Sequence, residues 1–268
     1  MSLIKGKVAL VVGGHRGIGY ECCASLLMNG IKGLMLVGRD EKKGNEATCE
    51  LETYGDGDIR FIKTDIAVAR NFQNVFETTI KTFNQLDMFI HCSETINEYH
   101  WENAIKLNLT SVLRGSIMAM KHYLPKYKSG KEGIIINLSS VAGLQPMASL
   151  PIYSSTKHGI IGLVRSLGSD YQYEQYQCRV MGLCPGLIEE IPLFAKNQPQ
   201  GIDLDLLDEE ICHWPKQSGD KCGKTLIKII NTGKNGSIWI CEGPYCYQWK
   251  FPNRFELFAT HAKEIAIG

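Results

Sequence analysis

A glycine-rich turn between an apolar run and a helical run constrains the fold of this chain more than any other feature. Residues 8–12, VALVV, are continuously apolar, the turn GGHRGIG follows at 13–19, and GYECCASLLMNG then reads as an amphipathic helix. A short apolar run without alternation is typical of a buried parallel strand. The start of the chain therefore predicts a strand–turn–helix unit of an α/β protein.

The spacing of Gly13, Gly17 and Gly19 suits this turn to binding phosphate. Glycines let the backbone approach a pyrophosphate, and the following helix directs its N-terminal N–H groups and its dipole at the negative charge. The alternative is a strand–helix corner that merely needs flexible residues.

Strand-like and helical runs alternate along the rest of the chain, as a doubly wound sheet requires. We expect one Rossmann-type domain over residues 1–268, with a mostly parallel seven-stranded sheet flanked by helices. The longest helices are predicted near 100–126 and 151–168, and Pro151 suits the first turn of the second. The predicted strands lie near 7–12, 33–38, 59–63, 86–91, 132–138, 178–184 and 236–241.

Composition agrees with a soluble protein of this kind. The 268 residues are 44% hydrophobic and 21% charged, so one large core is affordable, and the net charge of +1 gives no reason to expect nucleic acid or an acidic membrane surface. No apolar run approaches the roughly 18 residues of a membrane span, and the start lacks a signal peptide, so we expect a cytoplasmic protein.

Cysteine and histidine spacing predicts neither a disulfide scaffold nor a metal site. The ten cysteines contain no C-x-x-C pattern, and the histidines form no H-x-x-x-H pair. Cys241 and Cys246 flank a turn-like EGPY segment, and a late redox pair there is the alternative to two free thiols.

Tyr153 and Lys157 form a Y-x-x-x-K pair within the second long helix. Residues four apart lie on one helix face, and an ammonium beside a phenol favours the phenolate and lowers the pKa of the phenol. A tyrosine of this kind can exchange a proton with an alcohol or carbonyl oxygen. We therefore expect an acid–base pair here.

The order of these motifs resembles the short-chain dehydrogenase/reductase family over nearly the full length. The glycine turn is followed by Asp65, Asn108, Ser140 thirteen residues before Tyr153, Lys157, and then Pro185-Gly186. PIYSSTKHGIIGLVRSL resembles the 15-hydroxyprostaglandin dehydrogenase branch, and GSIWICEGPYCYQWKFP resembles the insect alcohol dehydrogenase-like members.

The resemblance implies an NAD(P)-dependent oxidoreductase that acts on CH–OH groups. Tyr153 would exchange the proton, Lys157 would lower the pKa of Tyr153 and hold the nicotinamide ribose, and Ser140 would stabilise charge on the substrate oxygen. Asn108 would fix a water that links Lys157 to solvent. Ser139 or Ser154 as the working hydroxyl, and Asn108 as an ordinary helix residue, remain open.

The same resemblance implies a dinucleotide site along the ends of the strands. Gly38 stands where an NAD enzyme would place an aspartate, and Arg16 and Arg39 suit a 2′-phosphate, so NADP(H) is favoured and NAD(H) is the alternative, with Asp40 as the ribose ligand. Asp65 would contact adenine, or cap the helix that begins near Val68. The expected cofactor residues are Gly13, His15, Arg16, Gly17, Ile18, Gly19, Arg39, Asp65, Ile66, Cys92, Tyr153, Lys157, Pro185, Gly186 and Ile188.

Three departures from the family pattern bear on activity. Where the family has N-N-A-G, this chain has HCSE, which ends in Glu94 in place of the glycine. The family's P-G-x-x-x-T is PGLIEE here, so its threonine is absent. Val12 replaces a threonine of the glycine turn. Carboxylates near a pyrophosphate cost affinity, so a relative that has lost efficient turnover and serves as a binding or storage protein is the second hypothesis.

For the substrate, the family positions predict contacts with Ser140, Gln145, Tyr153 and Leu187. The expected lining is apolar and predicts a hydrophobic alcohol or ketone. Residues 189–216 would form a flap over it, or only an acidic surface loop. The family also implies a homodimer or homotetramer through the two long helices. The other expected lining residues are Leu144, Pro146, Met147, Leu150, Ile191, Leu193 and Phe194.

Overall fold

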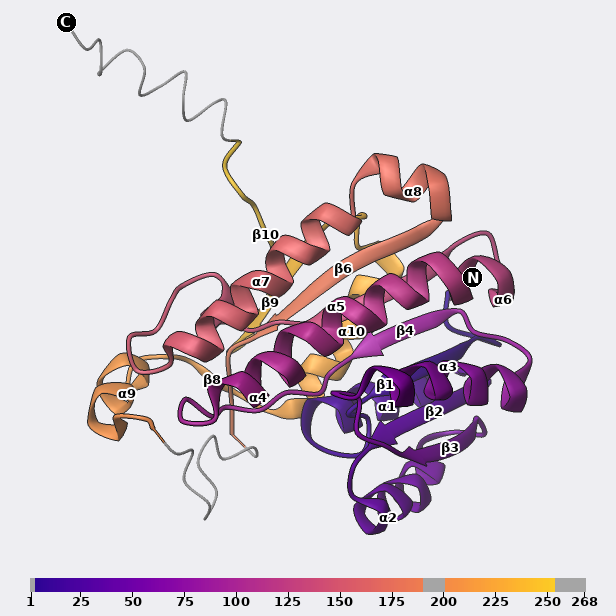
Figure 1. Ribbon diagram of the computed structural model, residues 1–268, viewed down its shortest axis with the longest axis horizontal. Helices are drawn as coiled ribbons and strands as arrows, with labels where there is room; N and C mark the ends of the chain where they lie inside the picture. Colours follow the sequence, from indigo (N-terminus) through magenta and orange to yellow (C-terminus); the bar gives the residue numbers. More distant parts are fainter. Residues whose placement is uncertain (1–2, 190–200, 254–268) are drawn as a thin grey trace, which may run out of the picture.

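The computed structural model describes residues 3–189 and 201–253, and its centre is an eight-stranded sheet (Figure 1). The strand order is β10-β9-β6-β5-β4-β1-β2-β3, and every neighbouring pair is parallel except β9 and β10. The strands are β1 (Val8–Val12), β2 (Gly33–Gly38), β3 (Asp58–Lys63), β4 (Met88–His91), β5 (Gly133–Leu138), β6 (Cys178–Pro185), β9 (Ile238–Glu242) and β10 (Tyr245–Trp249).

The seven predicted strands are present, and β10 is an eighth that the sequence analysis missed. It folds back on β9 through a turn in which Gly243 has a φ of 52°, a conformation that favours glycine. Most side chains of β10 are exposed, so it lacks the buried apolar run that is present in most of the other strands. Cys241 and Cys246 stand opposite each other across this pair, and all ten cysteines of the chain are free thiols.

Helices cover both faces of the sheet with separate apolar cores. One core joins the sheet to α1 (Gly17–Met28), α2 (Glu41–Leu51) and α10 (Gly219–Thr232). The other joins it to α3 (Ala69–Phe83), to the helical run 101–127 and to α7 (Pro151–Leu167), while α8 (Asp170–Tyr176) precedes β6. Residues Cys22 to Leu27 of α1 are all buried, because α1 packs against α10 as well as against the sheet. The predicted amphipathic pattern of α1 is therefore wrong.

The first of the two long helices runs from 101 to 127 with two π-helical turns. It comprises α4 (Trp101–Ile105), η2 (Lys106–Thr110), α5 (Ser111–Met118), η3 (Ala119–Tyr123) and α6 (Leu124–Tyr127). Such turns are rare and often occur at functional sites. The first of them contains Asn108.

The region predicted as a flap contains structure of its own. Helix α9 (Leu204–Ile211) lies there, and β7 (Leu187–Ile188) pairs with β8 (Lys216–Gln217) in a small second sheet. Residues 190–200 of this region, and 254–268 of the C-terminal tail, lie outside the described residues. Within the described ranges, no helix is long and apolar enough to cross a membrane.

Candidate active site

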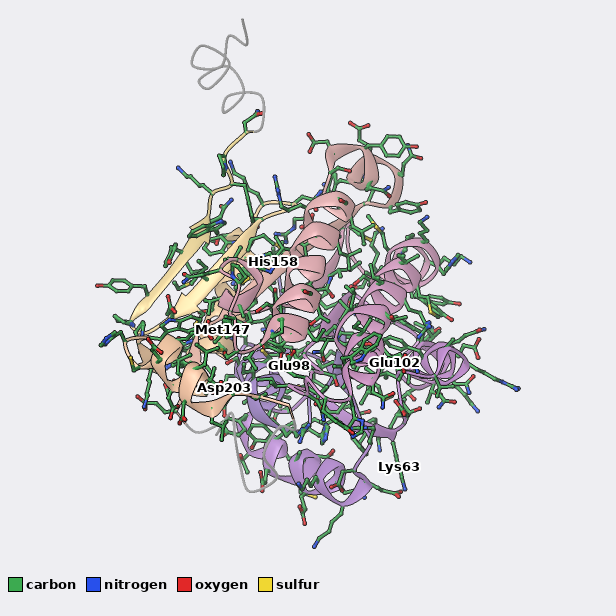
Figure 2. All side chains as sticks on the ribbon, turned by 60° about the vertical axis from the view of Figure 1, so that its left-hand side comes forward. Lys63, Glu98, Glu102, Met147, His158 and Asp203 are labelled. Carbon is green, nitrogen blue, oxygen red and sulfur yellow. The ribbon has the colours of Figure 1, made fainter. Side chains whose placement is uncertain are left out.

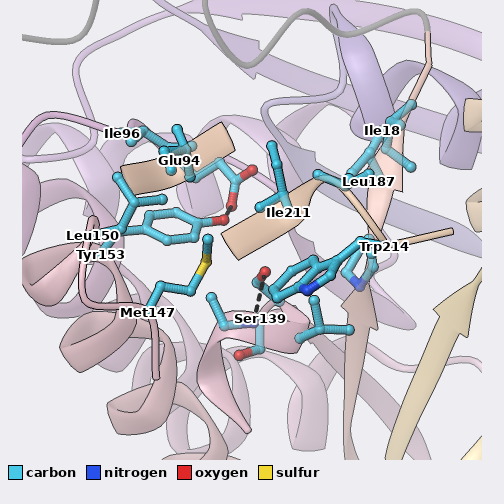
Figure 3. A pocket seen from close by; sticks show the side chains of 17 residues that line it. Ile18, Glu94, Ile96, Ser139, Met147, Leu150, Tyr153, Leu187, Ile211 and Trp214 are labelled. Carbon is cyan, nitrogen blue, oxygen red and sulfur yellow. Dashed lines mark hydrogen bonds between the residues drawn. The ribbon is translucent and has the colours of Figure 1, made fainter. Parts of the chain in front are cut away.

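The predicted site residues gather where the parallel strands end, which is where ligands bind in open α/β sheets. A pocket there has Ser139, Ser140 and Tyr153 on one side and the segment 185–188 on the other. Leu207 of α9 also lines it, as do Ile211 of the same helix and the nearby Trp214 (Figure 3). Apart from the hydroxyl groups and Glu94, its lining is mostly apolar.

Tyr153 and Lys157 lie on α7, one helical turn apart and deeply buried. Tyr153 is 6% exposed and Lys157 is 1% exposed, and the lysine Nζ lies 5.2 Å from the centre of the tyrosine ring. The first turn of α7 is fixed by Glu98, whose carboxylate accepts hydrogen bonds from the backbone N–H groups of Ile152 at 2.8 Å and of Tyr153 at 3.0 Å (Figure 2). This carboxylate satisfies helix N–H groups that would otherwise have no partner.

Glu94 contacts both α7 side chains and lines the pocket beside Tyr153. Its Oε2 accepts a hydrogen bond from the Tyr153 hydroxyl at 3.2 Å and also pairs with the ammonium of Lys157 (Figure 3). Burial raises the pKa of Tyr153 well above its ordinary value, the charge of Glu94 raises it further, and a hydrogen bond with Ser140 opposes the rise. The predicted lowering of this pKa by Lys157 is therefore wrong, because Glu94 pairs with the ammonium and the phenol lies in an apolar environment.

Ser140 lines the pocket together with Tyr153 and is the hydroxyl whose hydrogen bonding lowers the pKa of the phenol. Its Oγ accepts a hydrogen bond from the backbone N–H of Ala142 at 3.2 Å. The two alternative hydroxyls have other partners: Ser139 donates to the backbone carbonyl of Lys157 at 2.9 Å, and Ser154 accepts from the N–H of Met147 at 3.1 Å. The geometry favours Ser140.

Asn108 is buried and holds the segment that carries Glu94. Its Oδ1 accepts from the N–H of Thr95 at 2.9 Å, and its Nδ2 donates to the carbonyl of the same residue at 2.7 Å. It has no direct bond to Lys157 among the described residues. A buried residue with two bonds to one backbone position is more than an ordinary helix residue.

His91 and Cys92 begin the HCSE segment and are both buried. The Nε2 of His91 is 3.1 Å from the Ser111 hydroxyl, while its Nδ1 has no partner among the described residues. Burial, helped by the Lys157 ammonium, lowers the pKa of His91 to about 3. The imidazole is therefore neutral at physiological pH.

The glycine turn fits the pyrophosphate of a dinucleotide. Gly13 and Gly17 have φ values of 81° and 55°, and a Cβ at Gly19 would lie 2.3 Å from the carbonyl oxygen of Gly13. No side chain caps the N-terminus of α1, where Arg16 is the N-cap residue. The open N–H groups and the absence of side chains are what a bound phosphate requires.

A sequence model of the family described as short chain dehydrogenase matches residues 7–200. The chain belongs to the short-chain dehydrogenase family. Members of this family are oxidoreductases that act on CH–OH groups. The glycine turn, the Ser140–Tyr153 contact and the strand order described above agree with this membership.

Individual relatives agree with the assignment. The chain is 35% identical to the rat (Rattus norvegicus) 15-hydroxyprostaglandin dehydrogenase [NAD(+)] over 77% of this chain and 78% of the relative. It is 29% identical to alcohol dehydrogenase 1 of Ceratitis cosyra, over 88% of this chain and 92% of the relative. Its fold matches that of L-sorbose reductase from Gluconobacter frateurii, which was solved as a complex with NADPH and L-sorbose. The TM-score is 0.76 and the sequence identity is 21%, over 91% of this chain and 98% of the reductase.

At the end of β2, positively and negatively charged side chains lie close together in sequence. Arg16 and Arg39 are exposed and have no ion-pair partner among the described residues. Asp40 caps α2, because its carboxylate accepts a hydrogen bond from the backbone N–H of Lys43 at 3.1 Å. The residue that was the alternative ribose ligand therefore already has a partner. A Cβ added at Gly38 would lie 2.3 Å from Cε1 of the His15 ring. The side-chain space at this strand end is thus filled by imidazole.

Asp65 is exposed and accepts a hydrogen bond from the N–H of Ala67 at 3.0 Å. The helix after it, α3, has Val68 as its N-cap and no side-chain cap, so the alternative capping role of Asp65 is wrong. Ile66, the next residue, is buried in the core.

On the substrate side, Ser140, Tyr153 and Leu187 line the pocket as predicted, and Gln145 does not. Gln145 is exposed, because the loop that follows Ser140 turns it outward. Met147 and Leu150 line the pocket, Leu144 and Pro146 do not, and Ile191, Leu193 and Phe194 lie outside the described residues.

The sequence analysis missed the contribution of α9 to the pocket. Leu207, Ile211 and Trp214 recur at intervals of four and three, which is the helical spacing that could have revealed an apolar face. Glu210, on the same helix, accepts hydrogen bonds from the N–H groups of Ala148 at 2.6 Å and Ser149 at 3.2 Å. These bonds attach α9 to the loop beside Met147.

No group of three or more metal-ligating side chains occurs in the part of the chain that the structure describes.

Proposed function

We propose that this short-chain dehydrogenase interconverts a secondary alcohol and a ketone or aldehyde on a hydrophobic small molecule, with NADP(H) as its nucleotide. The observation that carries the proposal is that Ser140 and Tyr153 both line one mostly apolar pocket. The glycine turn that suits pyrophosphate opens toward the same edge of the sheet.

A nicotinamide nucleotide, when bound, would supply or accept the hydride. Tyr153 exchanges the proton with the substrate oxygen at its hydroxyl, and Ser140 donates a hydrogen bond to the same oxygen as charge develops on it. Lys157 holds a positive charge beside the phenol. Asn108 keeps the 92–98 segment in position through its two bonds to Thr95.

The preference for NADP(H) follows from the charges at the end of β2. Two unpaired guanidinium groups, Arg16 and Arg39, flank a position that has no carboxylate, which favours a 2′-phosphate. The relatives differ in this respect, because the rat enzyme is named for NAD(+) and the sorbose reductase was solved with NADPH. NAD(H) is therefore the competing choice.

A second candidate is a family member with little turnover that binds small molecules. It is favoured by one observation. Glu94 is hydrogen-bonded to Tyr153 and ion-paired with Lys157, and its charge helps to raise the pKa of the phenol, which keeps the phenol protonated. A carboxylate in this place opposes both nucleotide binding and the removal of a proton from an alcohol.

A titration with NADPH and NADH, followed by nucleotide fluorescence, separates the two candidates. The enzyme candidate predicts binding at micromolar to low-millimolar nucleotide, with NADPH the tighter, and turnover of a ketone or secondary alcohol from an apolar panel. Absence of binding by both nucleotides would contradict it. Tighter binding of NADH would overturn only the nucleotide preference.

A further inference from the structure

The positive charge of Lys157 does not reach the pocket. Lys157 is 1% exposed and does not line the pocket, whereas Glu94, with a side chain 29% exposed, does line it. The lysine Nζ donates to Oε2 of Glu94 and, at 3.2 Å, to the backbone carbonyl of Leu138. A molecule entering the pocket therefore meets a carboxylate in front of the ammonium.

The chain around Glu94 is fixed, so this placement is built into the fold. Thr95, the next residue, is bound by Asn108 through both its N–H and its carbonyl. On the preceding side, Ser93 lies so close to the glycine turn that a Cβ at Gly13 would be 2.9 Å from the Ser93 nitrogen. Four residues after Glu94, Glu98 is bonded to the first turn of α7. The carboxylate is directed at Lys157 by anchors on both sides.

We propose that Glu94 is an internal ligand of Lys157 that competes with the nicotinamide nucleotide, so that nucleotide binding requires Glu94 to leave the lysine. The inference rests on the proposed function in that it assigns the nucleotide to this pocket. A buried ion pair resists separation, because each charge loses its partner in a poorly solvated place. The pair therefore lowers the affinity for both nucleotides.

The same carboxylate controls the ionisation of Tyr153. The charge of Glu94 and its hydrogen bond to the hydroxyl both raise the pKa of the phenol. Removal of the charge leaves the phenol beside Lys157 and Ser140, two groups that favour the phenolate. Nucleotide affinity and tyrosine ionisation should thus respond together to a change at Glu94.

The test compares Glu94→Gly and Glu94→Gln with the native protein and with Glu102→Gln. The glutamine variant keeps an oxygen that Lys157 can bind and removes only the charge, which protects against a loss of folding in the glycine variant. Glu102 is an exposed residue of α4 (Figure 2), and its replacement changes the net charge equally without touching the pocket. Circular dichroism establishes that each variant is folded.

The first readout is the dissociation constant of NADPH and of NADH, measured by fluorescence without substrate. We expect Glu94→Gly to bind both nucleotides at least about tenfold more tightly, Glu94→Gln to lie between, and Glu102→Gln to match the native protein. Equal affinity of the native protein and both Glu94 variants would overturn the inference while leaving the proposed function intact. The inference would also be overturned if the native protein bound nucleotide and the folded Glu94 variants bound none.

The second readout is the ultraviolet titration of Tyr153, taken as the difference from a Tyr153→Phe partner in each background. The ionisation of Tyr153 should move to lower pH in Glu94→Gln, and an unmoved midpoint would contradict the inference. If the native protein turns over no substrate but the Glu94 variants bind nucleotide tightly, the proposed function fails and the inference stands.

Discussion

At the scale of single residues, the site combines the protonated phenol of Tyr153 with the buried ammonium of Lys157. The Tyr153 hydroxyl donates a hydrogen bond to Glu94, and the Glu94 carboxylate forms an ion pair with the Lys157 ammonium. The Y-x-x-x-K spacing predicted that the two residues share a helix face, and they do. It did not predict the electrostatics, because these depend on a side chain that arrives from the end of another strand.

The raised pKa of Tyr153 has a consequence for the direction of catalysis. A phenol that stays protonated through neutral pH is ready to act as an acid toward a carbonyl, whereas alcohol oxidation needs its deprotonated form. We expect the rate of alcohol oxidation to rise with pH up to at least pH 10, and the rate of carbonyl reduction to stay nearly flat below that. Rates across pH 6–10.5 at subsaturating nucleotide test this, because they report the nucleotide-free protein, in which Glu94 still contacts Tyr153. An oxidation rate that levels off near pH 7 would refute it.

His91 makes stability depend on pH. Its pKa is about 3 in the folded chain, against about 6.5 when unfolded, so the unfolded state takes up a proton first as pH falls. The free energy of unfolding should therefore fall by about 2 kcal/mol from this residue between pH 7 and pH 5. Urea unfolding of the native protein and of His91→Gln at both values measures it. Parallel losses in the two proteins would show that the imidazole is not responsible.

At the scale of elements, carboxylates from neighbouring segments position the two helices that border the pocket. Glu98 bonds to the first turn of α7, and Glu210 of α9 bonds to the loop at 148–149. Neither role could be read from the sequence, since each acid meets a backbone more than fifty residues away. The helices themselves follow from local patterns, with Pro151 at the start of α7 as predicted.

Replacement of Glu98 should loosen the first turn of α7. We expect Glu98→Ala to lower the free energy of unfolding by about 1 kcal/mol, the cost of losing a helix cap, and to reduce turnover because Tyr153 lies in that turn. Glu98→Gln, which retains an acceptor oxygen, should lose less of both. Denaturant unfolding and initial rates of the two variants provide the comparison. Native stability and turnover in Glu98→Ala would exclude a capping role.

At the scale of the whole molecule, the parallel sheet could be predicted from the sequence, whereas the pocket could be predicted only in part. The glycine turn and the strand-like runs predicted the sheet, and most of those runs are apolar and have no other way to be covered. The outer wall formed by α9 and the position of Glu94 were not predicted. Their neighbours in space are distant in sequence, and the resemblance to the family offers no precedent for a carboxylate where the family has glycine.

We propose that the protein assembles through the helical run 101–127 and α7, as the family resemblance implies. The apolar surface available is smaller than the sequence suggested, because Ile160, Ile161 and Val164 of α7 are buried in the chain's own core. Trp101, 48% exposed, and Ile117, 38% exposed, remain on the outer side. We expect light scattering to return a dimer or tetramer, and Ile117→Glu to weaken it. A monomer at tens of micromolar would contradict this proposal.

The central claim is that Tyr153 passes a proton to or from the substrate oxygen in the pocket it shares with Ser140. The most direct test is the rate of nucleotide oxidation with the best carbonyl substrate in the native protein and in Tyr153→Phe, each saturated with nucleotide. The account predicts a loss of about a hundredfold or more, with an unchanged dissociation constant for the nucleotide. A phenylalanine variant that turns over at the native rate would contradict it.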